Sequence, residues 1–278
     1  IVNVPPNSGD LAYTVATLTA KADNLVGQQL KPFSTEVIGR VRSFENYDDS
    51  KNWEQNRGIG TDNATMNPAW VYMHVLIGNG ADNPLGIRND QKLGDFVDLV
   101  TLKRWAKFCD DMNFTFNLII NSVSTIGELL QTICSVGMAT PLRPDGKYSV
   151  LFDGDPIHFT EEDGVYTIIP TQLITPENSW GLESTMSYVK KTHALKMKYL
   201  PLLKKVQETA IVYDENFNYD GSNYYKDSTT PPWKATVFET INLPGVTDYD
   251  HAHLLGSFYL AHESAPCQHT PRGQYSTQ

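Results

Sequence analysis

The sequence predicts an α+β protein in which two β-rich portions flank a helical middle. Apolar and polar residues alternate with a period of two near both ends, whereas the apolar spacing near the centre is helical. Strands and helices do not alternate regularly, as a parallel α/β sheet would require. We therefore expect four regions: a β-hairpin and loop over 1–66, a helix-rich part with one strand over 67–143, a β-rich part with a closing helix over 144–263, and a disordered tail over 264–278.

The first region carries two strand patterns. Residues 11–20 and 33–42 alternate in polarity and contain the Thr and Val that favour half-buried strands. The turn signal Asn24-Leu-Val-Gly27 lies between them, so the two strands are expected to pair as a hairpin. Over 44–66 the periodicity is lost and Asp and Gly are frequent, which predicts a surface loop.

The middle region opens with the clearest helix signal of the chain. Asn67 is a good N-cap, and Pro68 occupies the first helical position, where its missing N–H costs nothing. The helix is expected to run to Ile77 and to end at Gly78. A second helix, about Asp95–Asp110, follows from apolar residues at approximately helical spacing.

A strand and a third helix complete the middle region. The β-formers of 114–120 predict the strand. Ser124 is the expected N-cap of the third helix, with Glu128 in its first turn and Gly137 at its end.

The third region is predicted to be mainly β. A turn at 144–146 precedes strands expected at 148–152, 165–169, 185–192, 195–200, 209–213 and 237–243. A polar, aromatic loop is expected over 216–233. The closing helix, about Asp250–His262, has Thr247 as a possible N-cap.

Composition excludes several classes of protein. With 22 basic and 32 acidic residues the net charge is −10, which argues against a nucleic-acid binder that relies on a basic patch. No apolar run approaches the roughly 20 residues that span a bilayer. Only 19% of residues are charged, and 19 Asn, 25 Thr and abundant aromatics take their place. The chain starts with Ile1, and we expect it to be a piece of a longer protein.

The three cysteines show no metal-binding or disulfide pattern. Cys109, Cys134 and Cys267 lack C-x-x-C spacing. Cys109 and Cys134 lie in helix-like apolar stretches and are expected to be buried, reduced thiols, as suits assembly in a reducing cytosol.

Two clusters imitate metal sites. His251, His253 and His262 accompany Asp250 and Glu263, but histidines two apart diverge on a helix, so solvated imidazoles are the expected arrangement. The run from Asn216 to Asp227 imitates a calcium loop, with Asn218, Asp220 and Gly221 inside it. Its last position lacks a bidentate Glu, and a strand precedes it. A solvated hairpin loop is therefore the favoured interpretation.

Carboxylates supply the only candidates for catalysis. Asp153 and Asp155, or Glu161 and Glu162 with Asp163, would need to face each other across a cleft to act as an acid and base pair. Such residues in turns are usually just exposed, and no nucleophile elbow, zinc-protease motif or phosphate loop occurs. The sequence therefore predicts no enzymatic activity, no cofactor and no metal.

Aromatic residues late in the chain are the candidate contact residues. Tyr219, Tyr224, Tyr225 and Trp233 offer large contact areas at low entropic cost to a protein partner or a glycan. The alternative, that such side chains pack in the β core, stays open.

The order of these motifs resembles the central region of the tail-tip, host-specificity protein J family of long-tailed bacteriophages. The resemblance begins with Asn67-Pro-Ala-Trp70 and Pro84-Leu-Gly-Ile87. It continues with Arg104-Trp-Ala-Lys-Phe-Cys-Asp110 and then Phe114-Thr-Phe-Asn-Leu118. The later matches are 126–137, Asp145–Phe152, Thr209–Asn218 and Leu243–Thr247, and two upstream strands precede them, so the resemblance covers about residues 1–263. Residues 138–143 and 216–233 depart from the family pattern.

The resemblance implies a structural role and a tail-hub-like fold. Proteins of this family form a trimeric hub that closes the tail tube and carries the receptor-binding parts further toward the C-terminus. The implied partners are therefore other tail proteins, further copies of the chain and, through those missing parts, a host surface receptor. The implied location is the virion tail, assembled in the bacterial cytoplasm. Low charge suits such contacts, because charged residues are depleted at interface centres.

Two other functions remain as alternatives. A tail-associated cell-wall hydrolase would use the carboxylates at 153–163, and a glycan-binding module would use the aromatic residues of 216–233.

Overall fold

The computed structural model describes most of the chain from Val41 onward. The chain forms two compact units, 1–37 and 38–278, and every described residue belongs to the second. The described residues are 41, 43–57, 65–78, 84–119, 125–154, 159–162, 165–168, 179–186, 192–202, 204, 206–214, 217–219, 224–226, 233–263 and 267–273. Only the backbone is described for those of them that lie within 159–186 and 217–226, at 233 and 263, and within 267–273. The hairpin expected over 11–42 lies outside them, apart from Val41.

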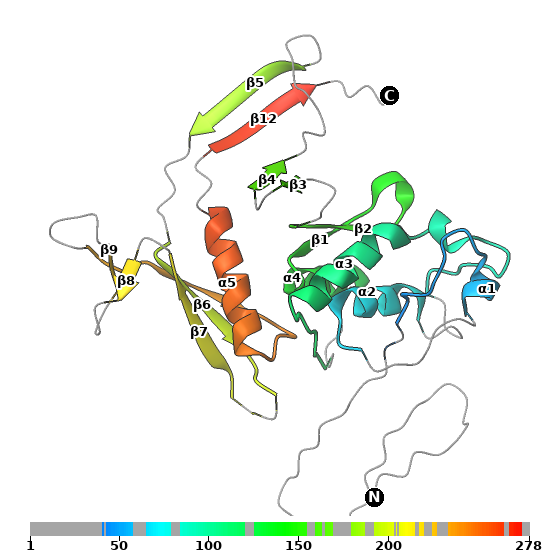
Figure 1. Ribbon diagram of the computed structural model, residues 1–278, viewed down its shortest axis with the longest axis horizontal. Coiled ribbons are helices and arrows are strands. Elements are labelled where there is room, and N and C mark those ends of the chain that lie inside the picture. The colour runs from blue at the N-terminus through cyan, green and yellow to red at the C-terminus, as the bar shows by residue number, and fades with distance from the viewer. Residues whose placement is uncertain are drawn as a thin grey trace, which may run out of the picture. The chain divides into compact units, whose positions relative to one another are not determined.

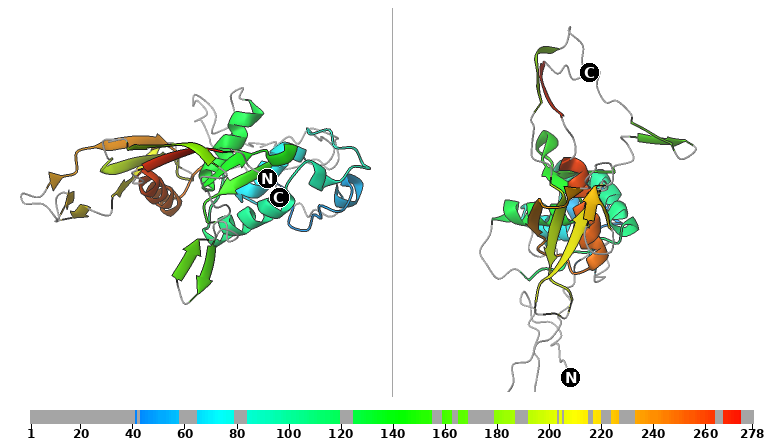
Figure 2. Two further views of the ribbon diagram at one scale, coloured as in Figure 1. Left: turned by 90° about the horizontal axis from the view of Figure 1, so that it is seen from above. Right: turned by 90° about the vertical axis from the view of Figure 1, so that its left-hand side faces the viewer.

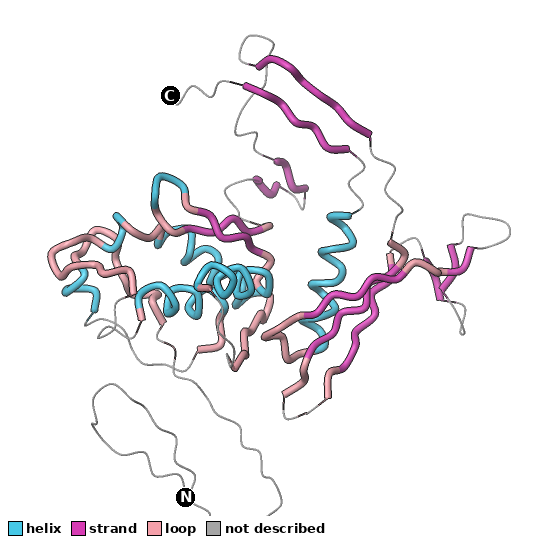
Figure 3. Tube along the Cα trace, turned by 180° about the vertical axis from the view of Figure 1, so that it is seen from behind, coloured by secondary structure: helices cyan, strands magenta, loops and turns pink. Residues whose placement is uncertain are grey.

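The expected α+β class is confirmed in the described residues, which form five α-helices and several small sheets (Figures 1 and 3). The helices are α1 (Trp53–Arg57), α2 (Pro68–Ile77), α3 (Leu99–Asp111), α4 (Ile126–Val136) and α5 (Tyr249–Glu263). None of these helices is long and apolar enough to cross a bilayer.

Helix α2 confirms its prediction at both ends. The Asn67 side chain accepts a hydrogen bond from the Ala69 amide at 2.9 Å, and Pro68 is the first helical residue. Gly78 ends the helix with φ 64°, a left-handed conformation that glycine adopts at little cost, and its amide donates to the carbonyl of His74.

Helix α3 begins four residues later than predicted. Asp98 is its N-cap and accepts from the Thr101 amide at 3.2 Å. The preceding residues Leu93–Asp95 form a 3₁₀ turn, and Val97 bridges to Tyr148. The local cap at Asp98 therefore outweighs the earlier start that the apolar spacing indicated.

The strand predicted over 114–120 is wrong for its described part, 114–119. These residues form no strand and pair with none. The Phe116 amide donates to the carbonyl of Met66 at 2.7 Å, and the Asn117 amide donates to that of Gly245 at 2.8 Å. Loop carbonyls thus satisfy the backbone in place of a ladder.

Helix α4 has the predicted body and end but a different N-cap. Thr125 accepts from the Glu128 amide, and the Glu128 carboxylate accepts from the Thr125 amide, which makes a capping box. The T-x-x-E spacing identifies Thr125 as the cap in place of Ser124, which lies outside the described residues.

Strands β1 (Ala139–Leu142) and β2 (Ser149–Phe152) form an antiparallel hairpin after α4. The predicted turn is confirmed as the 3₁₀ turn Pro144–Gly146, and β2 coincides with the expected strand apart from its first residue. Helices α2, α3 and α4 pack together beside this hairpin.

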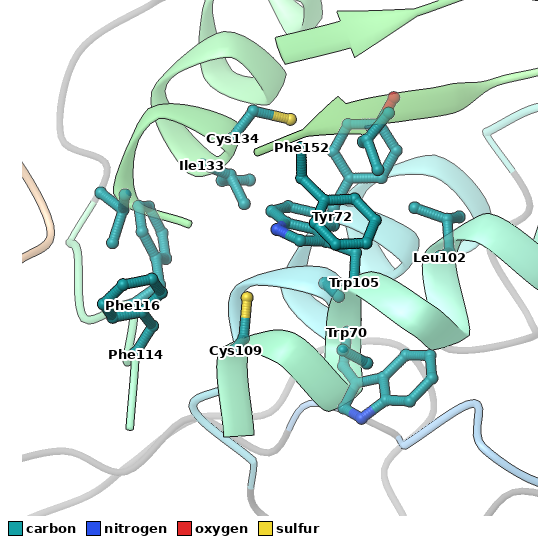
Figure 4. Close-up of a cluster of buried hydrophobic side chains, with 14 of the residues drawn as sticks. Trp70, Tyr72, Leu102, Trp105, Cys109, Phe114, Phe116, Ile133, Cys134 and Phe152 are labelled. Atoms are coloured by element: carbon teal, nitrogen blue, oxygen red, sulfur yellow. The ribbon is translucent and has the colours of Figure 1, made fainter. Parts of the chain in front are cut away.

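Trp105 lies at the centre of that packing (Figure 4). Its indole N–H donates to the carbonyl of Gly137 at 2.9 Å, and its ring meets Tyr72 edge-on at 5.9 Å. Cys109 and Cys134 are confirmed as buried, free thiols. Burial is the main cause that raises the pKa of each, so both stay neutral and pack as small apolar groups.

The surface loop predicted over 44–66 is wrong for 44–57. Phe44, Tyr47 and Trp53 are buried in the core, and α1 lies within the segment. Asn56 is buried as well, and its side chain bonds to the amide and carbonyl of Asp48. Paired polar groups of this kind let an irregular segment be buried.

A three-stranded sheet in the order β11-β6-β7 underlies α5 (Figures 1 and 2). Its strands are β6 (Ala194–Tyr199), β7 (Glu208–Tyr213) and β11 (Phe238–Asn242), close to three expected strands. Strand β6 is antiparallel to β7 and parallel to β11. Asp248 caps α5 by accepting from the amides of Asp250 and His251, so the expectation of Thr247 as the cap is wrong.

Gly256 brings α5 close to this sheet. A Cβ at that position would lie 2.6 Å from Cγ2 of Val212 and 3.0 Å from Cγ of Met197. The helix therefore rests on the face that carries Leu195, Met197 and Val212.

The remaining strands form three further small sheets. β3 (Phe159–Glu162) pairs with β4 (Val165–Ile168), β5 (Ser179–Met186) with β12 (Cys267–Gly273), and β8 (Phe217–Tyr219) with β9 (Tyr224–Lys226), which also pairs with β10 (Trp233–Lys234). Strand β12 falls where a disordered tail was expected. Its register shifts between Thr270 and Arg272, around Pro271, which has no N–H for the ladder.

Candidate functional site

The four predicted contact residues all lie on the small sheet β10-β9-β8. Tyr219 is the register partner of Tyr224, Tyr225 lies opposite Lys234, and Trp233 begins β10. Their side chains are outside what the structure describes, so the assignment as contact residues stays a prediction. Strands β8, β9 and the start of β10 lie within 216–233, so the expectation of a loop is wrong for these residues. Whether this segment is solvated or binds calcium stays a prediction.

The carboxylate candidates are described only in part. Asp153 follows β2, is exposed, and lies 3.3 Å from Nε2 of His262. Glu161 and Glu162 are backbone positions in β3, and Asp155 and Asp163 lie outside the described residues. The hydrolase alternative thus stays a prediction.

The histidines of α5 differ from one another, which corrects the expectation of solvated imidazoles. His262 is exposed, whereas His251 is only 3% exposed. The His251 ring stacks on Phe114 with a centroid distance of 4.5 Å, and Nε2 lies 2.8 Å from the carbonyl oxygen of Val136. Sequence spacing cannot identify this contact, because both partners lie more than 110 residues away. Within the described part of the chain, no three His, Cys, Asp or Glu side chains could hold a metal ion.

Two clefts lie side by side near the start of α3. One, of about 320 Å³, is lined by Asp48, Asp49, Lys51 and Lys103, among others, and the other, of about 260 Å³, by Asp49, Asp98, Asp145 and Lys147 among others. Lys103 already donates to the carbonyl of Tyr47, and Asp98 already accepts from Ser149 and Thr101. These hydrogen bonds tie part of the charged lining into the local structure.

The face of the β11-β6-β7 sheet turned away from α5 is the most distinctive surface among the described residues. Three rows of register partners cross it: Phe238, Ala194 and Tyr213; Thr240, Lys196 and Ile211; Asn242, Lys198 and Thr209. We call these nine residues the open sheet face. Phe238 is 38% exposed and Ile211 is 39% exposed.

Aromatic and cationic side chains organise the open sheet face. The rings of Tyr213 and Phe238 meet edge-on at 6.2 Å, across the buried Ala194. The Lys196 ammonium lies 4.9 Å from the centre of the Phe238 ring, within range of a cation–π contact. The nine residues include two lysines and no carboxylate. The face thus combines apolar area with positive charge in a chain whose net charge is −10.

Alternation in the sequence predicted these strands but not this surface. Lys196, Lys198 and Ile211 follow the period of two, but the parallel pairing of β11 with β6 brings Phe238 to the same face, 42 residues after Lys196 in the sequence.

Comparison with known proteins assigns no relative to the chain. No model of a known protein family matches the sequence, and no curated protein is significantly similar to it.

Proposed function

We propose that the chain is a structural component of a phage or prophage tail tip, part of the hub that closes the tail tube and connects to the receptor-binding parts. The collinear motifs from Asn67 to Thr247 support the family, and the open sheet face is the observation that carries the structural role. Phe238 and Ile211 are exposed. Contact with a partner removes their apolar area from water, which is energetically favourable.

The occupant of the open sheet face is a second copy of the chain. The face carries Lys196 and Lys198, whereas the chain as a whole has ten more acidic than basic residues. Another copy therefore offers complementary charge. A contact between unlike surfaces of identical subunits closes into a ring when the rotation allows, which fits a trimeric hub.

Photo-crosslinking in the assembled particle tests this proposal. A photoreactive amino acid placed at Ile211 should yield a product with the mass of two copies of the protein. The same group at Val100, which is also exposed but lies on α3, serves as the matched control and should yield no such product. A product between position 211 and a different protein would contradict self-association through this face.

Glycan binding is the second candidate, because the sheet β10-β9-β8 brings Tyr219, Tyr224, Tyr225 and Trp233 onto three adjacent short strands. A glycan array tests it. Binding that disappears in the double variant Tyr224→Ala, Tyr225→Ala but survives Val100→Ala would support this candidate, and an array without binding would reject it.

A further inference from the structure

His251 joins the start of α5 to two segments of the helical middle. Its ring lies against Phe114, which follows α3, and its Nε2 lies 2.8 Å from the carbonyl oxygen of Val136, the last residue of α4. Beside it, the Asn117 amide donates to the carbonyl of Gly245, and the Asn117 side chain donates to the hydroxyl of Thr247. We call these contacts the α5 junction.

The hydrogen-bond partner fixes the state of the imidazole. A carbonyl oxygen can only accept, so Nε2 carries the hydrogen. In the neutral ring Nδ1 then holds a lone pair, and this atom is buried without a hydrogen-bond partner among the described residues. A second proton would have to enter at Nδ1, where no described acceptor faces it.

The surroundings disfavour the charged ring. Burial lowers the pKa of His251, although the Val136 carbonyl and the Asp248 carboxylate act in the opposite direction. Asp248 already accepts from two amides at the start of α5. From α3 and α4, the titratable groups buried in the same core are Cys109 and Cys134, thiols that burial keeps neutral.

We propose that the α5 junction is an acid-sensitive contact, which opens when His251 takes up a proton. The neutral His251 ring donates to the Val136 carbonyl and stacks on Phe114, and no charge has to be removed from water. The protonated ring is better solvated when α5 has moved away from these two residues, because a buried charge is costly. The other polar groups of the junction, from Asn117, Gly245 and Thr247, do not titrate.

Hydrogen exchange across a pH series tests the proposal. The reporter is the protection factor of the Asn117 amide, corrected for the intrinsic pH dependence of exchange. Opening coupled to one proton should lower this protection by up to about tenfold per pH unit below pH 6.5. His251→Gln, whose side-chain amide can still donate to the Val136 carbonyl, should abolish this dependence of Asn117 protection on pH, called the slope below. His262→Gln removes an exposed histidine of the same helix and should keep it.

The slope decides the outcome. A wild-type protein without a slope below pH 6.5, or a slope that persists in His251→Gln, would overturn the proposal. If His251→Gln does not fold, nitrogen chemical shifts of the His251 ring in the wild-type protein take the place of this variant. They should show the Nε2–H tautomer above pH 7. They should also show that the ring becomes protonated over the same pH range in which the Asn117 amide loses protection. A ring that protonates while protection stays constant would equally overturn it.

Discussion

At the residue scale, single polar side chains connect segments that are distant in the sequence. Asn67 is the clearest case, because it caps α2 and also donates from Nδ2 to the carbonyl of Ala106 at 2.8 Å and to the carboxylate of Asp110 at 2.7 Å. The sequence predicts the cap from Asn67 and Pro68, but not the second role, since the contacts with α3 depend on how the two helices pack.

Asn67→Ala should lower the free energy of unfolding by about 2–3 kcal/mol. The cap contributes about 1 kcal/mol, and the loss of the partly buried hydrogen bonds from Nδ2 to the Ala106 carbonyl and the Asp110 carboxylate adds about 1–2 kcal/mol. Urea denaturation measures the loss. Asn67→Ser keeps the capping oxygen and should recover about 1 kcal/mol of it. Equal stabilities for the wild type and the alanine variant would contradict this account.

Acid should destabilise the start of α3 at a lower pH than the pH at which it opens the α5 junction. Burial opposes the charged form of Asp98, but hydrogen bonds from Thr101 and Ser149 outweigh it and lower its pKa below the ordinary value of 3.8. Its contribution to stability is therefore complete above pH 3.8 and is lost as the pH falls through the lower folded pKa. Thermal melts from pH 5 to pH 2.5 should show a smaller decline for Asp98→Asn than for the wild type.

At the scale of elements, local chemistry and packing decide different things. The ends of α2 follow from Asn67 and Gly78, and a capping box marks α4, so these helices are accessible to sequence analysis. The segment 114–119 contains strong β-formers, yet its amides bond to Met66 and Gly245. No local pattern contains that information, because the partners come from loops on either side in the sequence.

Two glycines, both inside helices, should respond oppositely to alanine. At Gly256 a methyl group would overlap Val212, so Gly256→Ala should cost about 1–2 kcal/mol after the helix-propensity gain. At Gly127 in α4 a Cβ meets nothing within 4 Å, so Gly127→Ala should stabilise by about 0.5–1 kcal/mol. Denaturant unfolding compares them. A stabilising Gly256→Ala would show that α5 does not rest closely on the sheet.

At the scale of the whole molecule, the described residues contain one hydrophobic core cluster and several small sheets of two or three strands. The core could be predicted in part, since α2, α3 and α4, all expected from the sequence, supply 15 of its 35 buried residues, whereas the burial of Phe44, Tyr47 and Trp53 was not expected. The open sheet face could not, because it depends on the parallel register of β11 with β6. The proposed role in a tail tip therefore combines motif order from the sequence with a surface that only the fold reveals.

Electron cryo-microscopy of the phage particle that is proposed to contain this chain tests the central claim most directly. The account predicts three copies around the tail axis at the tip, closing the tail tube, with the face that carries Lys196, Ile211 and Phe238 against a neighbouring copy. A chain that is missing from the particle, or that lies away from the tail axis, would contradict it.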